Sequence, residues 1–158
     1  MYNSSPDTDA TFTTPGLLRR LAAIVYDLML LLGILFVATA VVLPLTDGEA
    51  VRPGNPIYAT YIFFICFFFY GWFWTHGGQT LGMRAWKLRV QQRNGAGLTW
   101  WHALLRFLVA IISWLALGLG FLWILVDPER ATWHDRASET VIVRLPPQRG
   151  REGGSNPP

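Results

Sequence analysis

The sequence predicts an all-α integral membrane protein, a small helical bundle of two long spans plus a third apolar segment. Of its 158 residues, 52% are hydrophobic and only 15% are charged, against roughly 25% charged residues in soluble domains. The apolar residues form long uninterrupted runs, which is typical of a chain surrounded by lipid. The cationic residues lie beside those runs, so the net charge of +3 indicates membrane flanks and argues against nucleic-acid binding.

Two of the apolar runs are long enough to cross a lipid bilayer. The first covers residues 21–43 and contains one charged residue, Asp27. At about 1.5 Å per residue a helix of this length exceeds the roughly 30 Å of a hydrocarbon core. Helix-breaking prolines and glycines follow, and then residues 57–74 form a second run that is uncharged and strongly aromatic. These two runs are the predicted spans.

The distribution of arginine and lysine predicts the orientation. Four of them lie in the polar stretch of residues 75–102, whereas the connection over residues 44–56 contains Arg52 alone. By the positive-inside rule we expect the N-terminus and the 75–102 loop in the cytoplasm, and the protein in the cell (inner) membrane. Within that loop, the alternation over residues 88–91 predicts a small strand, and the following Asn94-Gly95 is a hairpin signal because both residues tolerate positive φ.

The third apolar segment, residues 103–126, has two interpretations. A straight span would place the C-terminus outside, although the arginines that follow it favour the cytoplasmic side. Two short helices bent over residues 113–120 would return the chain to the cytoplasm. There, residues 141–143 would form a minor β-pairing with the strand near Val90. We favour this bent helical hairpin, with Arg106 extending its head group to the membrane interface.

Asp27 is the first candidate for a functional residue, because it lies inside a span. It follows Arg20 by seven residues, so the two share one face of a helix. A carboxylate at that depth costs on the order of 3 kcal/mol. We therefore expect it to face the interior, near a polar or cationic group of Arg20, Arg106 or the segment 133–136. Two roles stay open: an ion or proton site, and a polar contact that fixes helix packing.

The sequence contains no evident catalytic, metal or cofactor motif. Cys66 is the single cysteine, so neither an intrachain disulfide nor a thiolate zinc site can form. The pair His134-Asp135 is a weak metal signal and fits better as a loop anchor at the membrane surface. The glycines of residues 77–82 favour a helix-end turn with close backbone contacts over a phosphate loop. We expect no enzyme activity, no cofactor and no metal.

Three motifs, in chain order, give the chain a resemblance to a known family. They are Arg20-Leu-Ala-Ala-Ile-Val-Tyr-Asp27, then Gly78-Gln-Thr-Leu-Gly-Met83 with Leu88-Arg-Val, and finally Trp133-His-Asp-Arg-Ala-Ser-Glu-Thr-Val-Ile-Val143. With them, residues 16–145 resemble the RDD family of membrane proteins. The polar residues 1–15 and the Pro- and Gly-rich residues 146–158 flank this membrane domain as tails that we predict to be disordered.

The resemblance also assigns site residues. The family is named for one arginine and two aspartates, which correspond here to Arg20, Asp27 and Asp135, with Arg19 as a rival for the arginine. The family often has glycine where this chain has Glu139, in front of the last predicted strand. Its biochemical role is largely undefined, and transport of ions or small solutes is the usual proposal.

Two functions follow as expectations. In the first, the protein transports an ion or small solute, Asp27 takes up and releases a cation or proton, and Arg20, Arg106 and His134 support it. Three short segments can hardly enclose a path, so this function requires a homo-oligomer or a membrane partner protein. In the second, the protein is a non-transporting scaffold or a module that binds lipid or a partner, and the basic residues 84–93 touch anionic head groups.

Overall fold

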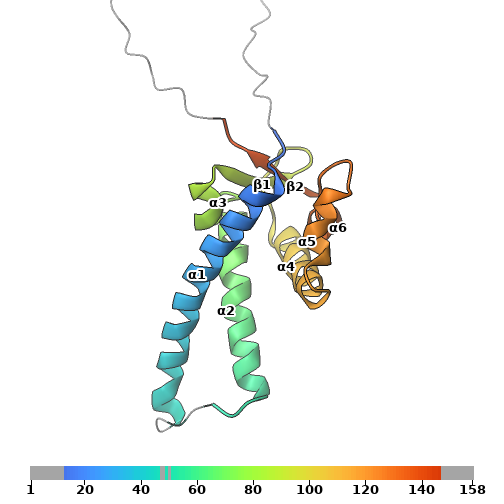
Figure 1. Cartoon of the computed structure of the whole chain (residues 1–158). Coiled ribbons are helices and arrows are strands. Elements are labelled where there is room, and N and C mark those ends of the chain that lie inside the picture. The colour runs from blue at the N-terminus through green and yellow to red at the C-terminus, as the bar shows by residue number, and fades with distance from the viewer. Residues whose placement is uncertain (1–12, 47–48, 50, 147–158) are drawn as a thin grey trace, which may run out of the picture.

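The structure, a computed structural model, describes residues 13–46, 49 and 51–146, and this part of the chain is mostly helical (Figure 1). The helices and strands, in chain order, are α1 (Leu17–Val42), η1 (Leu43–Thr46), α2 (Pro56–Thr75), α3 (Leu81–Ala85), β1 (Leu88–Gln92), α4 (Trp100–Leu115), α5 (Leu119–Leu122), η2 (Trp123–Leu125), α6 (Trp133–Ala137) and β2 (Thr140–Arg144). Helices α1 and α2 form a long hairpin, and α3, β1, β2 and α6 lie together at its open end (Figure 1). We call these four elements the cap layer.

The hairpin contains the two predicted spans. Among the described residues, α1 with η1 and α2 are long and apolar enough to cross a membrane, and most of their surface lies open. Asn55 starts α2, because its side chain accepts hydrogen bonds from the backbone N–H groups of Ile57 and Tyr58. Near the connection, a hydrogen bond of 2.7 Å joins the hydroxyls of Thr39 and Tyr58. The predicted helices are confirmed, and each extends a little beyond its predicted range.

The cap layer contains the predicted β-pairing. Strands β1 and β2 are antiparallel, and Val90 lies opposite Ile142. The turn after β1 also forms, with Gly95 at a φ of 85°. It does not make a hairpin with the next residues, because the partner of β1 comes from far along the chain. Arg144 in turn donates a backbone hydrogen bond to Thr13, which brings the two ends of the described chain together.

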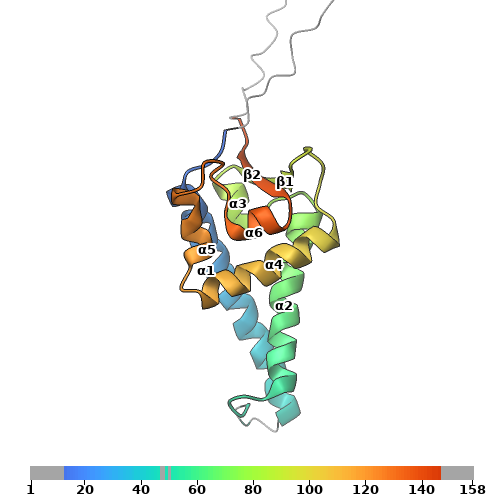
Figure 2. The same ribbon diagram turned by 90° about the vertical axis from the view of Figure 1, so that its right-hand side faces the viewer.

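The third apolar segment is bent, and a straight span is excluded. Helix α4 and the helical stretch Leu119–Leu125 meet at 107°. Leu117 and Gly118 at the break have positive φ angles, and the Gly118 N–H donates to the carbonyl of Ser113 at 2.8 Å. Helix α4 crosses the hairpin near its open end instead of running beside it (Figure 2). This confirms the bent interpretation of the segment.

The buried core lies where the hairpin meets the cap layer. Its residues come from α1, α2, α3, β1 and α4 and from the connection between β1 and α4. They are Ala23, Trp74, Met83, Leu88, Val90, Leu98, Ala103 and Phe107. Gly82 in α3 lies so close to α1 that a Cβ atom there would collide with the carbonyl oxygen of Ala23. The predicted close backbone contact in the glycine segment is therefore present, and it fixes α3 against α1.

The predicted tails fall mostly outside the description. Residues 1–12 and 147–158 lie outside the described residues, so the prediction of disorder there stays a prediction. Thr13, which we assigned to the N-terminal tail, is described and pairs with Arg144.

Candidate functional site

A cavity of about 370 Å³ lies below the cap layer, between α1, α2 and α4. Its walls are apolar, and its polar lining residues are few and come mainly from the end nearest the cap layer: Arg20, Asp27, Thr80, Arg106, Thr132 and His134. Leu21, Leu28 and Trp114 also line it and are 38%, 36% and 57% exposed. The cavity thus reaches the molecular surface between α1 and α4, where the surface is apolar.

A buried group of charges, which we call the arginine cluster, consists of Arg20, Arg106 and Asp135. Arg20 Nη1 donates to one carboxylate oxygen of Asp135 at 2.8 Å, and Arg106 Nη1 donates to the other at 2.6 Å. All three side chains are at most 6% exposed. Arg106 also donates to the hydroxyl of Thr140, and its guanidinium lies 5.2 Å from the ring centre of Trp74. One carboxylate therefore joins α1, α4 and α6.

The local sequence of α6 places Asp135 in this position. Thr132 is the N-cap, and its hydroxyl accepts a hydrogen bond from the backbone N–H of Asp135. Asp135 in return accepts one from the backbone N–H of Thr132 at 3.2 Å, which completes a capping box. This reciprocal cap orients the carboxylate toward the two arginines, and the adjacent His134 is buried in the same turn.

The protonation states within α6 follow from burial and charge. Burial lowers the pKa of His134 to about 3, so its ring is neutral at pH 7. Burial alone would raise the pKa of Asp135, but the charges of Arg106 and Arg20 and the hydrogen bond from Arg106 hold the pKa of this carboxyl below its ordinary value. Asp135 is therefore a carboxylate at pH 7.

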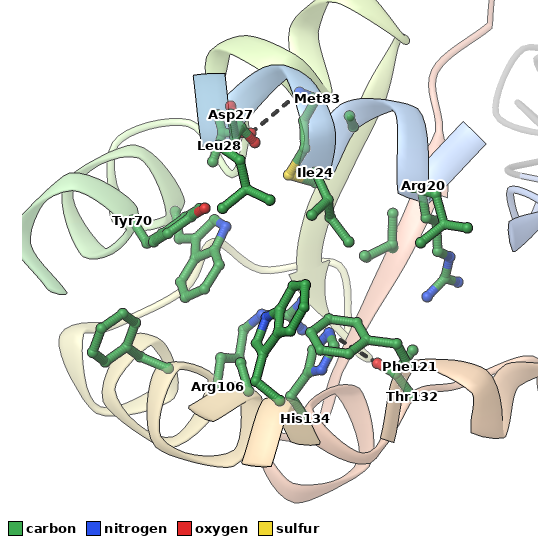
Figure 3. Close-up of a pocket in the computed structure, with 18 of the residues that line it drawn as sticks. Arg20, Ile24, Asp27, Leu28, Tyr70, Met83, Arg106, Phe121, Thr132 and His134 are labelled. Atoms are coloured by element: carbon green, nitrogen blue, oxygen red, sulfur yellow. Dashed lines mark hydrogen bonds between the residues drawn. The ribbon is translucent and has the colours of Figure 1, made fainter. Parts of the chain in front are cut away.

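Asp27 lies on a different side of the cavity and has different partners (Figure 3). One of its oxygens accepts a hydrogen bond from the Thr80 hydroxyl, and the other accepts one from the Gly82 backbone N–H at 2.8 Å. Thr80 is the N-cap of α3, so Asp27 satisfies donors at the start of a helix from outside that helix. Asp27 is 3% exposed and fastens α1 to α3.

The comparison with protein families gave a match. The model of the RDD family matches residues 14–139, which is most of the chain. The chain belongs to the RDD family. Neither the search of curated proteins nor the search of solved structures gave a match. Membership in the RDD family and the apolar helices together fit a membrane protein.

The structure separates Arg20, Asp27 and Asp135, the three residues that the resemblance assigned to the family's name. Arg20 and Asp135 form an ion pair, although 115 residues lie between them in the sequence. Asp27 is bonded to Thr80 and Gly82 instead, so the predicted partners of Asp27 were wrong. The prediction that Asp27 faces the interior is confirmed by its burial. Arg19, the rival for the arginine, is partly exposed and lines a second surface depression, whereas Arg20 is buried. Which of the two corresponds to the arginine in the family's name stays a prediction.

Two further expectations need correction. Arg106 was expected at the membrane interface, but it is buried against Asp135, because it lies on the inner face of α4. His134-Asp135 was expected as a surface loop anchor, but both residues are buried within α6. Among the residues that the structure describes, no group of three or more His, Cys, Asp or Glu side chains is placed to hold a metal.

Sequence reasoning missed several residues of this region. Thr80 and Thr140 provide hydroxyls to Asp27 and Arg106, and the Arg130 carbonyl accepts from Arg20 Nη2 at 3.1 Å. For Thr80 a signal was present, because a threonine that directly precedes a helical stretch is a common N-cap. Nothing local in the sequence indicated Thr140 or the Arg130 carbonyl as partners.

The turn before β2 forms despite the non-glycine residue there. Glu139 adopts a φ of 52°, in the left-handed region that glycine enters most easily. The difference from the family's common glycine therefore leaves the turn in place and puts an ordinary side chain in a less favourable conformation.

Proposed function

We propose that this protein is an inner-membrane module that binds an apolar or amphiphilic molecule from the lipid phase in its cavity. The observation that carries the proposal is the cavity between α1, α2 and α4, whose walls are apolar and which reaches the surface beside exposed apolar side chains. Its volume of about 370 Å³ is in the range of small-molecule sites. A cavity that opens on lipid selects its ligand from lipid.

The orientation that we propose places the cap layer and both termini in the cytoplasm. Supporting this, Arg84 and Lys87 lie beside the strands at the open end of the hairpin, whereas Arg52 lies in the connection at its other end (Figure 1). The positive-inside rule then puts the connection outside. Reporter proteins fused after Gly54 and after Asn94 test this. We expect an external reading after Gly54 and a cytoplasmic reading after Asn94, and readings from one side only would contradict the orientation.

Binding in the cavity is tested with a cavity-filling variant and a matched control. Ala110 lines the cavity, and Ala110→Trp places a large ring inside it. Ala40 is exposed on α1 and is not among the lining residues, so Ala40→Trp makes the same chemical change elsewhere. After delipidation and addition of a neutral single-chain lipid, native mass spectrometry should show one retained lipid on the wild type and on Ala40→Trp. Ala110→Trp should retain none. Equal retention by both variants would place the lipid on the outer surface.

Transport of an ion or small solute is the second candidate, and the position of Asp27 favours it. Its carboxylate lines the cavity, and within residues 13–46, 49 and 51–146 it forms no salt bridge. A buried carboxylate without a cationic partner is a candidate for proton or cation exchange. Because one chain contributes a single hairpin, a continuous path would need a homo-oligomer or a partner protein.

A flux screen separates the two candidates. Purified protein in sealed vesicles is tested with a panel of ions and small solutes, and Asp27→Asn is compared with Glu129→Gln, which removes an exposed carboxylate. Transport predicts a flux that Asp27→Asn abolishes and Glu129→Gln keeps. Lipid binding without any flux in the wild type would leave the binding module as the function.

A further inference from the structure

We infer that the cavity selects an anionic lipid, with the acyl chain along the apolar walls and a carboxylate or phosphate head group at the arginine cluster. This inference rests on the proposed function, since it names the ligand class of the same cavity. It draws on the charge of the cluster, on its unpartnered donors and on its position at one end of an apolar space.

The charges of the cluster do not balance. Arg20 and Arg106 are both bonded to a single carboxylate, that of Asp135, while the neighbouring His134 ring is neutral. Asp127 is paired with Arg136. Asp27 lines the same cavity, but it is bonded to Thr80 and Gly82 and forms no ion pair with either arginine. Within the arginine cluster itself, one positive charge is therefore not paired, and burying an unpaired charge is costly. An anionic head group would supply the missing negative charge.

The cluster also has hydrogen-bond donors to spare. Among the described residues, three buried side-chain nitrogens have no hydrogen-bond partner. Arg20 Nε and Arg106 Nε are donors, whereas His134 Nδ1 donates or accepts according to the tautomer of its neutral ring. All three residues line the cavity and are at least nine-tenths buried. An unsatisfied buried polar group costs about 1–3 kcal/mol, so the two unpaired Nε–H donors of Arg20 and Arg106 indicate a missing acceptor. The oxygens of a carboxylate or phosphate are such acceptors, and guanidinium groups bind them well.

The shape of the cavity decides between a lipid and a free anion. Arg106, Thr132 and His134 gather on one side of it, beside Phe121 (Figure 3), and the opposite side is lined by side chains such as Ile24, Leu28 and Met83. A small hydrated anion would leave these apolar walls without contacts, whereas an acyl chain fills them and is stabilised by the burial of its methylene groups. A single chain suits a cavity of about 370 Å³.

The test compares ligands that differ only in the head group. The delipidated full-length protein in an uncharged detergent is titrated at pH 8 with oleate, methyl oleate and oleylamine, which share one chain. We expect oleate to bind at least about tenfold more tightly than methyl oleate, and oleylamine to bind most weakly. Equal affinity for oleate and methyl oleate would overturn the charge selection and leave cavity binding intact. Absence of binding by all three would overturn both proposals.

A variant and an ion control complete the test. Arg20→Gln should bring the ratio of oleate to methyl oleate affinity close to one, whereas Arg84→Gln, the same change at an exposed arginine of the cap layer, should leave the ratio unchanged. Circular dichroism and size-exclusion chromatography verify the fold of each variant. If Arg20→Gln does not fold, the affinities of the wild type for oleate, methyl oleate and oleylamine decide whether the cavity selects an anion. If acetate or inorganic phosphate raises the melting temperature as much as oleate does, the site binds free anions and the lipid is excluded.

Discussion

Asp27 and Asp135, the two aspartates that the resemblance assigned to the family's name, are both almost fully buried, yet their hydrogen-bond partners are of opposite kinds. Asp135 is bonded to two arginines, whose charges it compensates in part. Asp27 is bonded to a hydroxyl and a backbone N–H, and no charge opposes it within the described chain. The comparison indicates that a carboxylate in a family signature has no single role. Its function depends on whether the partner needs its charge or only its oxygen atoms, and substitution by asparagine separates these cases.

Among these variants, Asp135→Asn is expected to lower the free energy of unfolding the most. Asparagine keeps the size and one acceptor oxygen but removes the charge, so Arg20 and Arg106 would be buried without a counter-charge. Breaking a buried pair in this way costs about 3–5 kcal/mol. The free energy of unfolding in detergent micelles, followed by tryptophan fluorescence against denaturant, measures it. Glu129→Gln in the exposed pair with Arg93 is the control and should change stability by less than about 0.5 kcal/mol.

Asp27→Asn is expected to lower the free energy of unfolding less than Asp135→Asn does. The asparagine oxygen can still accept from the Gly82 N–H. At the other position an NH₂ group, which is a donor, replaces the oxygen that accepts from the Thr80 hydroxyl. We expect a loss of about 1–2 kcal/mol, typical of one buried hydrogen bond. The same unfolding measurement applies. A loss as large as that of Asp135→Asn would remove the distinction between the two carboxylates and would indicate an unrecognised cation near Asp27.

The free energy of unfolding is expected to depend on pH because of two buried groups of α6, His134 and Asp135. The unfolded chain protonates His134 near pH 6.5, whereas burial keeps the folded pKa at about 3. The unfolded state therefore binds more protons between these values, so the free energy of unfolding is highest above pH 6.5 and falls as the pH is lowered. The lowered pKa of Asp135 acts in the same direction at more acidic pH.

The variant His134→Gln isolates this contribution. Glutamine does not titrate, so the loss of stability between pH 7 and pH 5 should be smaller in the variant than in the wild type. The melting temperature in detergent at the two pH values gives the comparison. An identical loss in both proteins would show that another group causes the acid sensitivity.

The smallest change in stability is expected for a substitution of Glu139, which lies in the turn directly before β2. Its positive φ favours glycine, so Glu139→Gly should stabilise the protein by about 0.5–1 kcal/mol. Glu129→Gly, at a residue without a positive φ, should not stabilise it. The denaturant midpoint measures both. If Glu139→Gly destabilises the protein, the glutamate side chain itself contributes to the turn.

The sequence was informative where a local pattern determines structure. Run length and composition predicted the two long helices, and the arginines after residue 126 together with Gly118 and Gly120 predicted the bend. The alternation near Val90 predicted the strand, and the apolar residues 141–143 predicted its partner. Each of these follows from a few neighbouring residues, which is why they needed no knowledge of the tertiary contacts.

The partners of the buried charges could not be predicted in this way. Arg20 and Asp27 do share a helix face, but seven residues separate them by roughly 10 Å along the axis. Over that distance the face of α1 passes from α6 to α3, so the two side chains meet different elements. The pairing of Arg20 with Asp135 depends on how α4 crosses the hairpin, and a single sequence carries no local signal for it.

The ion pair between Arg20 and Asp135 also has a consequence for biosynthesis. The arginine leaves the ribosome 115 residues before its carboxylate, and at about 5–20 residues per second that interval is on the order of ten seconds. During this time α1 is already available for insertion, while Arg20 has no counter-charge from its own chain. The nascent arginine must then be stabilised by water, by lipid phosphates or by the insertion machinery. A chain that stops before α6 keeps this unpaired cation.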